Sequence, residues 1–205
     1  MNIEKAFRLP FSEDGLVKVI IGAVLNLIPI VNFLSMGYLL ELTGNVIQGR
    51  EDLPAWEDWG GKFIKGLMVA VIAFIYMFIP MLVMMLGGGA AAFAGSAGGS
   101  IFFALIGFLL CLVVWFILPM ALTNFAATGN FGSAFAFGEI FGMITGALGQ
   151  YLTVFGISIA GGFVLGIIGM IPLLGWIVLL LGGFYIGLVI CFLLGQVYRS
   201  VGGGA

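Results

Sequence analysis

Apolar residues dominate six stretches of this chain, and short polar or glycine-rich links separate them. The first stretch, 16–28, would form a helix of roughly 20 Å, which is shorter than the roughly 30 Å hydrocarbon core of a bilayer. Pro29 interrupts the apolar pattern, and a second stretch continues over 30–48. This pattern predicts either a short Pro-broken hairpin that enters and leaves by one face or a pair of tilted spans in a thin bilayer.

Four longer apolar stretches follow, and each predicts a membrane-spanning helix, because uncharged runs of about 20 residues are what a bilayer requires. A loop of glycine, alanine and serine is expected at 87–100, and a turn at 166–172. The sequence therefore predicts an all-α, polytopic membrane protein with five or six membrane-embedded helices. The four long helices are expected over 60–86, 101–124, 134–165 and 173–199.

The same pattern leaves one membrane domain with two short ends. Residues 1–15 are polar and predict a cytoplasmic, interfacial lead-in. Residues 16–200 form the single transmembrane domain, and 201–205 are expected to be a flexible tail.

Charge is concentrated at the start of the chain. Fourteen charged side chains lie between Glu4 and Lys65, and only Glu139 and Arg199 follow. In the six-helix arrangement, all seven Lys and Arg residues fall on one side of the membrane. The positive-inside rule then predicts a multi-pass protein of the cell membrane with both termini in the cytoplasm.

Composition excludes several classes of function. The chain is 62 % hydrophobic and 8 % charged, has no His, and carries every Asp outside the apolar runs. Histidine-ligated haem or zinc, Ser/His proteases and a membrane-buried aspartyl dyad are therefore excluded. A net charge of −2 without a basic stripe argues against nucleic acid. We expect no cofactor, no metal and no enzyme activity.

An internal repeat links the first and second halves. Asn45–Gly49 resembles Asn124–Gly129, and Trp59–Phe63 resembles Phe137–Phe141, at an offset of about 78 residues. Two spans separate the matched sites, so the pattern predicts a parallel repeat of helical hairpins. Repeats of this kind are common in transporters. The competing interpretation is that glycine-rich apolar sequences align with themselves by chance.

Glycine is patterned as well as abundant. A spacing of four residues places small side chains along one helix face, where backbones can approach closely. The pattern predicts that the fifth and sixth expected helices pack tightly, or that they form a seam for self-association. The residues concerned are Gly138, Gly142 and Gly146 in the fifth helix, and Gly183, Gly187 and Gly195 in the sixth.

The tetrapeptide Trp56-Glu57-Asp58-Trp59 is the most distinctive in the chain. Its tryptophans are typical of an aromatic belt at headgroup depth, and Asp58 is a suitable N-cap for the next helix. Lys62 and Lys65 are expected to reach lipid phosphates. The alternative is that Trp56, Glu57, Asp58 and Trp59 form a loop that docks a partner or gates a path.

Glu41 and Glu139 are the acidic residues closest to membrane depth. A carboxylate in lipid costs several kcal/mol unless it is paired, hydrated or protonated, so both are candidate functional residues. The alternative is that each is shallow and reaches headgroup water. The sequence shows no obvious basic partner for either in a neighbouring span.

Three parts of the chain form recognisable motifs: Leu27–Tyr38, Leu53–Gly60 with Phe63 and Gly66, and Ala134–Ile140. These segments resemble a known prokaryotic membrane family, domain of unknown function 4013. The segment Trp56–Gly60 is the most specific of these, whereas the loop at 87–100 lies outside the resemblance. The resemblance implies a helical membrane protein and implies no activity.

Two classes of function remain open. The first is a non-catalytic accessory or scaffold subunit of a larger membrane assembly, whose partners are membrane lipids and either other membrane subunits or further copies of this chain. Small-residue seams and the lack of catalytic residues favour it. The second is a small transporter, channel or lipid-handling protein, which the repeat, the Pro-broken hairpin and the two carboxylates favour.

Overall fold

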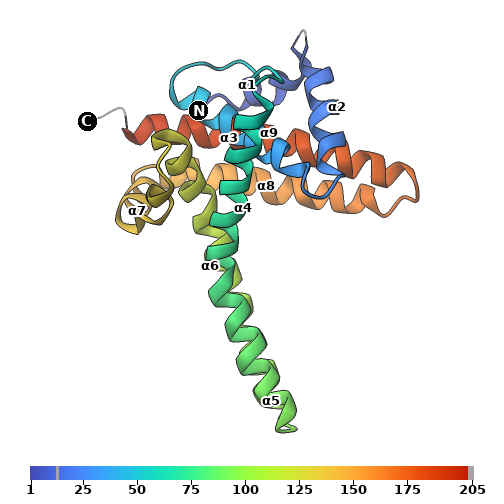
Figure 1. The fold of residues 1–205 in the computed structure, drawn as a ribbon, viewed down its shortest axis with the longest axis vertical. Coiled ribbons are helices and arrows are strands. Elements are labelled where there is room, and N and C mark those ends of the chain that lie inside the picture. Colours follow the sequence, from blue (N-terminus) through green and yellow to red (C-terminus); the bar gives the residue numbers. More distant parts are fainter. Residues whose placement is uncertain (13, 203–205) are drawn as a thin grey trace. The chain divides into compact units, whose positions relative to one another are not determined.

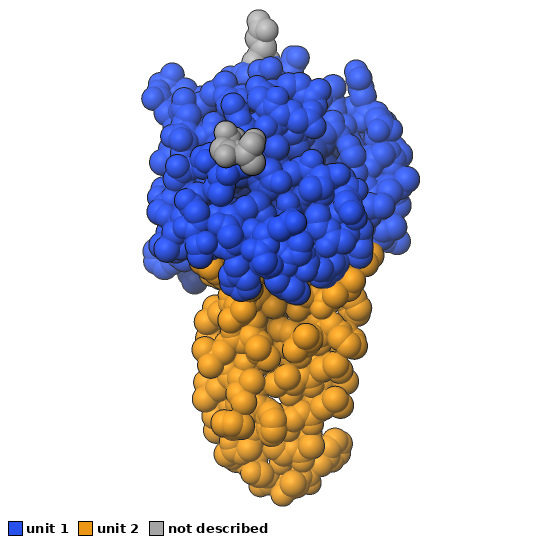
Figure 2. All heavy atoms as spheres, turned by 90° about the vertical axis from the view of Figure 1, so that its left-hand side faces the viewer, with its two compact units in different colours: residues 1–69, 120–205 blue, residues 70–119 orange. Residues whose placement is uncertain are grey.

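The computed structural model describes residues 1–12 and 14–202, and these residues form helices and connecting turns without any strand. They divide into two compact units, one formed by 1–69 with 120–205 and the other by 70–119 (Figure 2). The predicted all-α class is confirmed.

The larger unit begins with three short elements and ends with the two long helices α8 and α9 (Figure 1). Its helices carry the site described below. Their bounds are α1 Ile3–Arg8, η1 Leu9–Phe11, α2 Gly15–Asn26, α3 Asn32–Ile47, the first turns of α4 Trp59–Leu82, the end of α6 Ala97–Thr128, η3 Phe131–Phe135, α7 Phe137–Gly146, α8 Leu148–Gly169 and α9 Leu174–Gly202.

Helix α9 is the centre of this unit, because it contacts α1, α2, α3, α7 and α8. Its side chains Phe184, Leu188 and Phe192 are almost fully buried. Helix α8 runs alongside it as the other arm of a hairpin (Figure 1). These contacts account for the apolar side chains on the packed faces of α9, whereas others, such as Trp176 and Ile177, face outward.

Two Pro-containing turns join the helix pairs α2/α3 and α8/α9. Pro29 is followed by Ile30 at φ 74°, and Pro172 by Leu173 at φ 65°. In the first turn the Asn32 amide donates to the carbonyl of Ile28, the residue before the proline. In the second turn the Gly175 amide donates to the carbonyl of Ile171 in the same position. The two turns are therefore built alike, and the predicted Pro-broken N-terminal hairpin is confirmed with arms of 12 and 16 residues.

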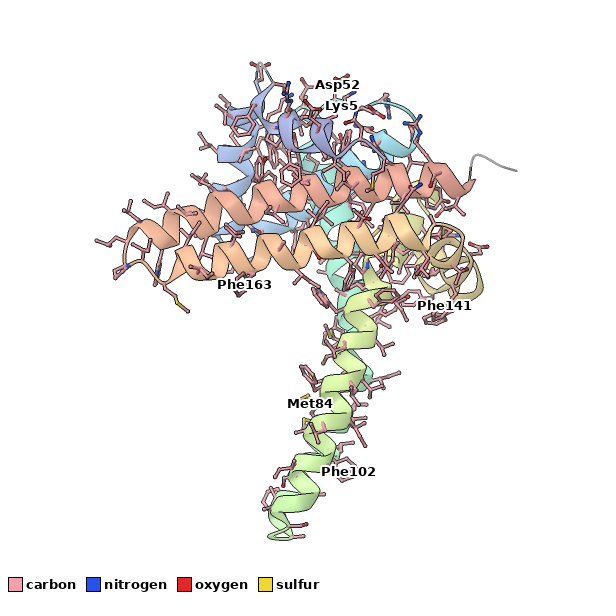
Figure 3. All side chains as sticks on the ribbon, turned by 180° about the vertical axis from the view of Figure 1, so that it is seen from behind. Lys5, Asp52, Met84, Phe102, Phe141 and Phe163 are labelled. Atoms are coloured by element: carbon pink, nitrogen blue, oxygen red, sulfur yellow. The ribbon has the colours of Figure 1, made fainter. Side chains whose placement is uncertain are left out.

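The smaller unit is a helical hairpin made of the remainder of α4, η2 Val83–Gly88, α5 Gly89–Phe93 and most of α6. The predicted loop at 87–100 is wrong, because only Ala94–Ser96 interrupt the helices. Glycine is tolerated in apolar helices. Pro80 lies inside α4, just before the π-helical segment, and its missing amide hydrogen removes one regular helix bond. Met84 and Phe102 mark the two arms (Figure 3).

Among the described residues, four helical segments are long and apolar enough to cross a membrane: Trp59–Phe93, Ala97–Thr128, Leu148–Gly169 and Leu174–Gly202. Helix α2 is a shorter apolar helix. Many large apolar side chains face outward, including Phe74, Phe93 and Ile101. Because water would not tolerate such a surface and lipid would, the protein is a multi-pass helical membrane protein.

The predicted continuous helix 134–165 is wrong. The backbone bends at Ala147, where φ is −127° and ψ is 36°, so α7 ends at Gly146 and α8 begins at Leu148. The segments matched in the internal repeat are both helix–link–helix units, but α4 continues as a long helix where α7 stops. No proline marks the break, which is why the apolar pattern did not reveal it.

The glycines of the predicted strips differ in their surroundings. A methyl group at Gly138 or Gly142 would meet no atom within 4 Å, whereas one at Gly146 would lie against Val201 of α9, the predicted partner helix. In α9, Gly183 faces open space as well. The close approaches of α8 and α9 use other glycines, whereas Gly187 and Gly195 lie against Leu39 and Val46 of α3.

The two ends of the chain are partly helical. The lead-in forms α1 and η1, and Asn2 caps α1 by accepting from the Lys5 amide at 3.0 Å. At the other end α9 includes Val201 and Gly202, the first residues of the predicted tail. The rest of that predicted tail, 203–205, lies outside the described residues.

Candidate functional site

The loop between α3 and α4 is fixed in place although it has no regular secondary structure. The Trp56 indole N–H donates to the Lys18 carbonyl at 3.2 Å, and the Lys18 ammonium donates to the Leu53 carbonyl at 3.1 Å. The Tyr38 hydroxyl donates to the Pro54 carbonyl at 2.9 Å. These bonds attach the loop to α2 and α3, so we name residues 49–58 the anchored loop.

Aromatic stacking adds to this anchoring. The Tyr38 and Trp56 rings stack with centroids 4.3 Å apart, and Trp56 stacks in turn on Trp59 at 5.6 Å. Tyr38 is completely buried, whereas Trp59 is 46 % exposed. The stack therefore runs from the core of the unit to its surface and presents one tryptophan outward.

Asp58 caps helix α4. Its carboxylate oxygen accepts from the Gly61 amide at 3.1 Å, which satisfies one of the free N–H groups at the helix start. Asp58 adopts φ 47°, a left-handed conformation that Asp tolerates better than most residues. The predicted capping role is confirmed, and Glu57, Asp58 and Trp59 are all exposed.

Glu41 has two basic partners, which corrects the prediction that it has none. Its carboxylate lies 3.2 Å from the Lys62 ammonium and 3.5 Å from that of Lys65. The Lys62 side chain is 2 % exposed and also donates to the Glu57 carbonyl at 2.7 Å. Lys62 is therefore held inside the protein, and the prediction that it reaches lipid phosphate is wrong.

Two clefts of about 390 Å³ each open beside this ion pair. Both are lined by Glu41, Asn45, Arg50 and Lys65, so they meet at these four side chains. The Glu41 side chain is 24 % exposed, consistent with its position on the cleft walls. Polar atoms of α3, the anchored loop and α4 thus converge in one place.

Glu139 lies in a second polar group at the start of α7. It accepts from the Asn124 amide at 3.2 Å, and the same amide nitrogen donates to the Ser133 carbonyl at 3.0 Å. The Tyr198 hydroxyl donates to the other end of Asn124 at 3.3 Å. Glu139 itself is exposed, whereas Asn124 is only 2 % exposed and holds α6, η3 and α9 together.

Glu51 joins three distant parts of the chain. Its carboxylate lies 2.7 Å from the Lys5 ammonium and 3.1 Å from the Arg199 guanidinium, and it accepts from Gln196 at 3.5 Å. The N-terminus, the anchored loop and the end of α9 therefore lie together, as Figure 3 shows for Lys5 and the loop residue Asp52. The sequence carried no signal for this cluster, because the partners of Glu51 lie 46 to 148 residues away from it along the chain.

We expect the Glu51 cluster to make stability depend on pH. The hydrogen bond from Lys5, followed by the charges of Lys5 and Arg199, lowers the Glu51 pKa below its ordinary value of 4.5 against a smaller opposing effect of burial. Ionised Glu51 therefore stabilises the fold fully above about pH 4.5, and this stabilisation disappears as the pH falls through the lowered pKa of Glu51. Since the group is partly exposed, the contribution is about 1 kcal/mol or less.

Thermal unfolding midpoints between pH 3 and 7 test this expectation. Replacing Glu51 by Gln should lower the midpoint at pH 7 and leave it unchanged at the acid end, where wild type and variant converge. A constant difference between the two proteins across that range would contradict it.

Taken together, the fold and the site define a multi-pass helical membrane protein with an anchored polar loop at one end. Among the described residues, no group of three His, Cys, Asp or Glu side chains is placed to hold a metal ion. Residues 21–174 match the family described as protein of unknown function DUF4013, and the chain belongs to that family. Searches of curated proteins and of solved structures found no significant match.

Proposed function

We propose that the protein is a non-catalytic accessory subunit of a membrane assembly and docks its partner through the anchored loop. The observation that carries this proposal is the outward presentation of Glu57, Asp58 and Trp59 from a backbone fixed on both sides. A surface loop held this firmly is preorganised, and preorganisation lowers the entropy lost on binding. Tryptophan is also among the residues that contribute most to protein interfaces.

Both carboxylates near membrane depth have structural partners, which further supports an accessory role. Glu41 is paired with Lys62 and Lys65, and Glu139 is hydrogen-bonded to Asn124. Neither needs to be explained by a transported ion. Self-association through the open faces of Gly138 and Gly142 is compatible with such a subunit.

The shared location of the basic residues supports a cytoplasmic position for both termini. Lys5 and Arg199 lie together because both pair with Glu51, the residue that follows Arg50 in the chain. The positive-inside rule assigns such a basic region to the cytoplasm. The anchored loop would then meet its partner on the cytoplasmic side of the cell membrane.

Replacement of Trp59 by Ala should remove the partner without unfolding the protein. Truncating a central interface tryptophan typically costs 2 kcal/mol or more, which is about a 30-fold loss of affinity. Trp176, which is 78 % exposed on α9, provides a matched control. Native size after mild-detergent purification checks the result, and equal losses from Trp59→Ala and Trp176→Ala would refute docking at the loop.

A second candidate function is transport or lipid handling, and the two clefts beside Glu41 favour it. They give a partly exposed carboxylate access to the surface of the larger unit. Under this alternative, reconstituted vesicles would show a solute or lipid flux that occlusion of the clefts beside Glu41 abolishes. Wild-type flux without any partner protein would favour it over the accessory role.

A further inference from the structure

The two clefts beside the anchored loop share four lining residues, Glu41, Asn45, Arg50 and Lys65, and differ in the chemistry of their other walls. Both belong to the unit formed by residues 1–69 and 120–205, and each has a volume of about 390 Å³. Ligand pockets usually measure about 300–1,000 Å³, so either is large enough to hold part of an organic molecule.

Each cleft adds a different wall to the shared residues. The first adds apolar side chains, among them Ile64 and Met68 of α4 and Phe125 of α6. The second adds the acidic side chains Glu57 and Asp58, together with Pro54, Ala55 and the buried Lys62 that pairs with Glu41. An apolar wall and an acidic wall therefore lie on either side of the shared junction.

Positive charge is in excess at the junction. The Arg50 guanidinium donates to the amide oxygens of Asn45 at 2.7 Å and Gln48 at 2.6 Å, and no carboxylate of the described residues pairs with it. Lys65 must share the Glu41 carboxylate with buried Lys62. One carboxylate thus faces two ammonium groups, and Arg50 adds an unneutralised charge beside them.

The acidic wall has the opposite character. The Glu57 carboxylate has no hydrogen-bond or ion-pair partner in the part of the chain that the structure describes, and its side chain is exposed. Asp58 uses one oxygen to cap α4. Glu57 therefore offers a free anionic group next to the cationic junction.

Apolar, cationic and anionic zones in this order match the acyl chains, phosphate and ammonium of an aminophospholipid. We infer that the joined clefts bind one molecule of phosphatidylethanolamine, with its phosphate at Arg50 and Lys65, its ammonium at Glu57 and its acyl chains along Ile64, Met68 and Phe125. Arginine binds phosphate oxygens in a bidentate manner, and a primary ammonium donates up to three hydrogen bonds to carboxylates. A trimethylated choline headgroup has no such donors.

Depth in the membrane agrees with this assignment. Helix α4 opens a candidate span at Trp59, so Glu57 lies just before the span and Met68 lies inside it. Headgroups lie at the ends of spans and acyl chains lie farther in. The lipid site shares Glu57 with the proposed docking surface, but it requires no partner protein, so lipid binding by the isolated protein tests it separately from docking.

Native mass spectrometry of the delipidated full-length protein tests the inference. The protein is offered equal amounts of phosphatidylethanolamine, phosphatidylcholine and phosphatidylglycerol with identical acyl chains. We expect phosphatidylethanolamine adducts to exceed the others by about tenfold, and Arg50→Gln to remove about the same factor through loss of charge-assisted bonds. Glu57→Gln should retain lipid but bind phosphatidylethanolamine and phosphatidylcholine equally.

Arg8→Gln, which removes a 79 % exposed guanidinium that pairs with Glu4, is the matched control and should bind as wild type. Equal adducts of the three lipids on the wild type, or unchanged binding by both Arg50→Gln and Glu57→Gln, would overturn the site. Soluble phosphoethanolamine, added at the same concentration as the lipid, could also displace all bound phosphatidylethanolamine. That result would overturn the lipid assignment and leave a free headgroup as the ligand.

Discussion

Replacing Gly37 or Gly66 by Ala is expected to destabilise the protein more than any other single methyl addition. A methyl at Gly37 would overlap the Lys62 carbonyl, and one at Gly66 would overlap the Phe33 carbonyl. Both obstacles are backbone atoms, so no side chain can rotate away. The expected loss is about 3 kcal/mol, at the upper end for overpacking, or roughly a 10 °C lower unfolding midpoint.

Gly142→Ala is the matched control for these variants. A methyl there meets no atom within 4 Å, and Ala is the better helix former, so the midpoint should hold or rise slightly. Thermal unfolding in mild detergent measures all three proteins under one condition. Equal midpoints for Gly37→Ala, Gly66→Ala and Gly142→Ala would show that α3 and α4 are not in backbone contact.

Glu41→Gln is expected to have the second large effect. The substitution leaves the Lys62 ammonium, whose side chain is 2 % exposed, without its counter-charge and close to Lys65. Breaking one partner of a buried ion pair costs about 3–5 kcal/mol, and partial exposure of Glu41 places this case near about 3 kcal/mol. The thermal unfolding midpoint should fall accordingly, whereas Glu139→Gln, at an exposed carboxylate, should change it little.

A double substitution separates charge pairing from general damage at this position. Glu41→Gln combined with Lys62→Met removes both charges and keeps an apolar chain of similar length, so most of the lost stability should return. If the double variant is less stable than Glu41→Gln alone, the two side chains do not act as a pair, and the structural role assigned to Glu41 is wrong.

Local features of the fold could be predicted because they depend on neighbouring residues. Long uncharged runs indicate spans, Pro29 and Pro172 interrupt helices, and Asp58 caps the helix that follows it. The bend at Ala147 escaped prediction because neither proline nor a charged residue marks it. The neighbours of the patterned glycines could not be predicted for a related reason, since spacing along one helix does not identify the helix that packs against it.

The site was harder to predict because its contacts join distant segments. The partners of Glu41 come from α4 only once the anchored loop has folded back over α2 and α3. Gly37 and Gly66, which allow that approach, share no spacing pattern. The sequence could therefore nominate Glu41 and the Trp56–Trp59 segment but could not show that Lys62 connects them.

The most direct test of the accessory role is the native mass of the wild-type protein, purified in mild detergent from cells that express it at natural levels. The proposed function predicts a stoichiometric complex with another membrane protein, which separates when Trp59 is replaced by Ala and persists when Trp176 is replaced. Recovery of the chain only as a monomer or as copies of itself would contradict the accessory role and favour transport or lipid handling.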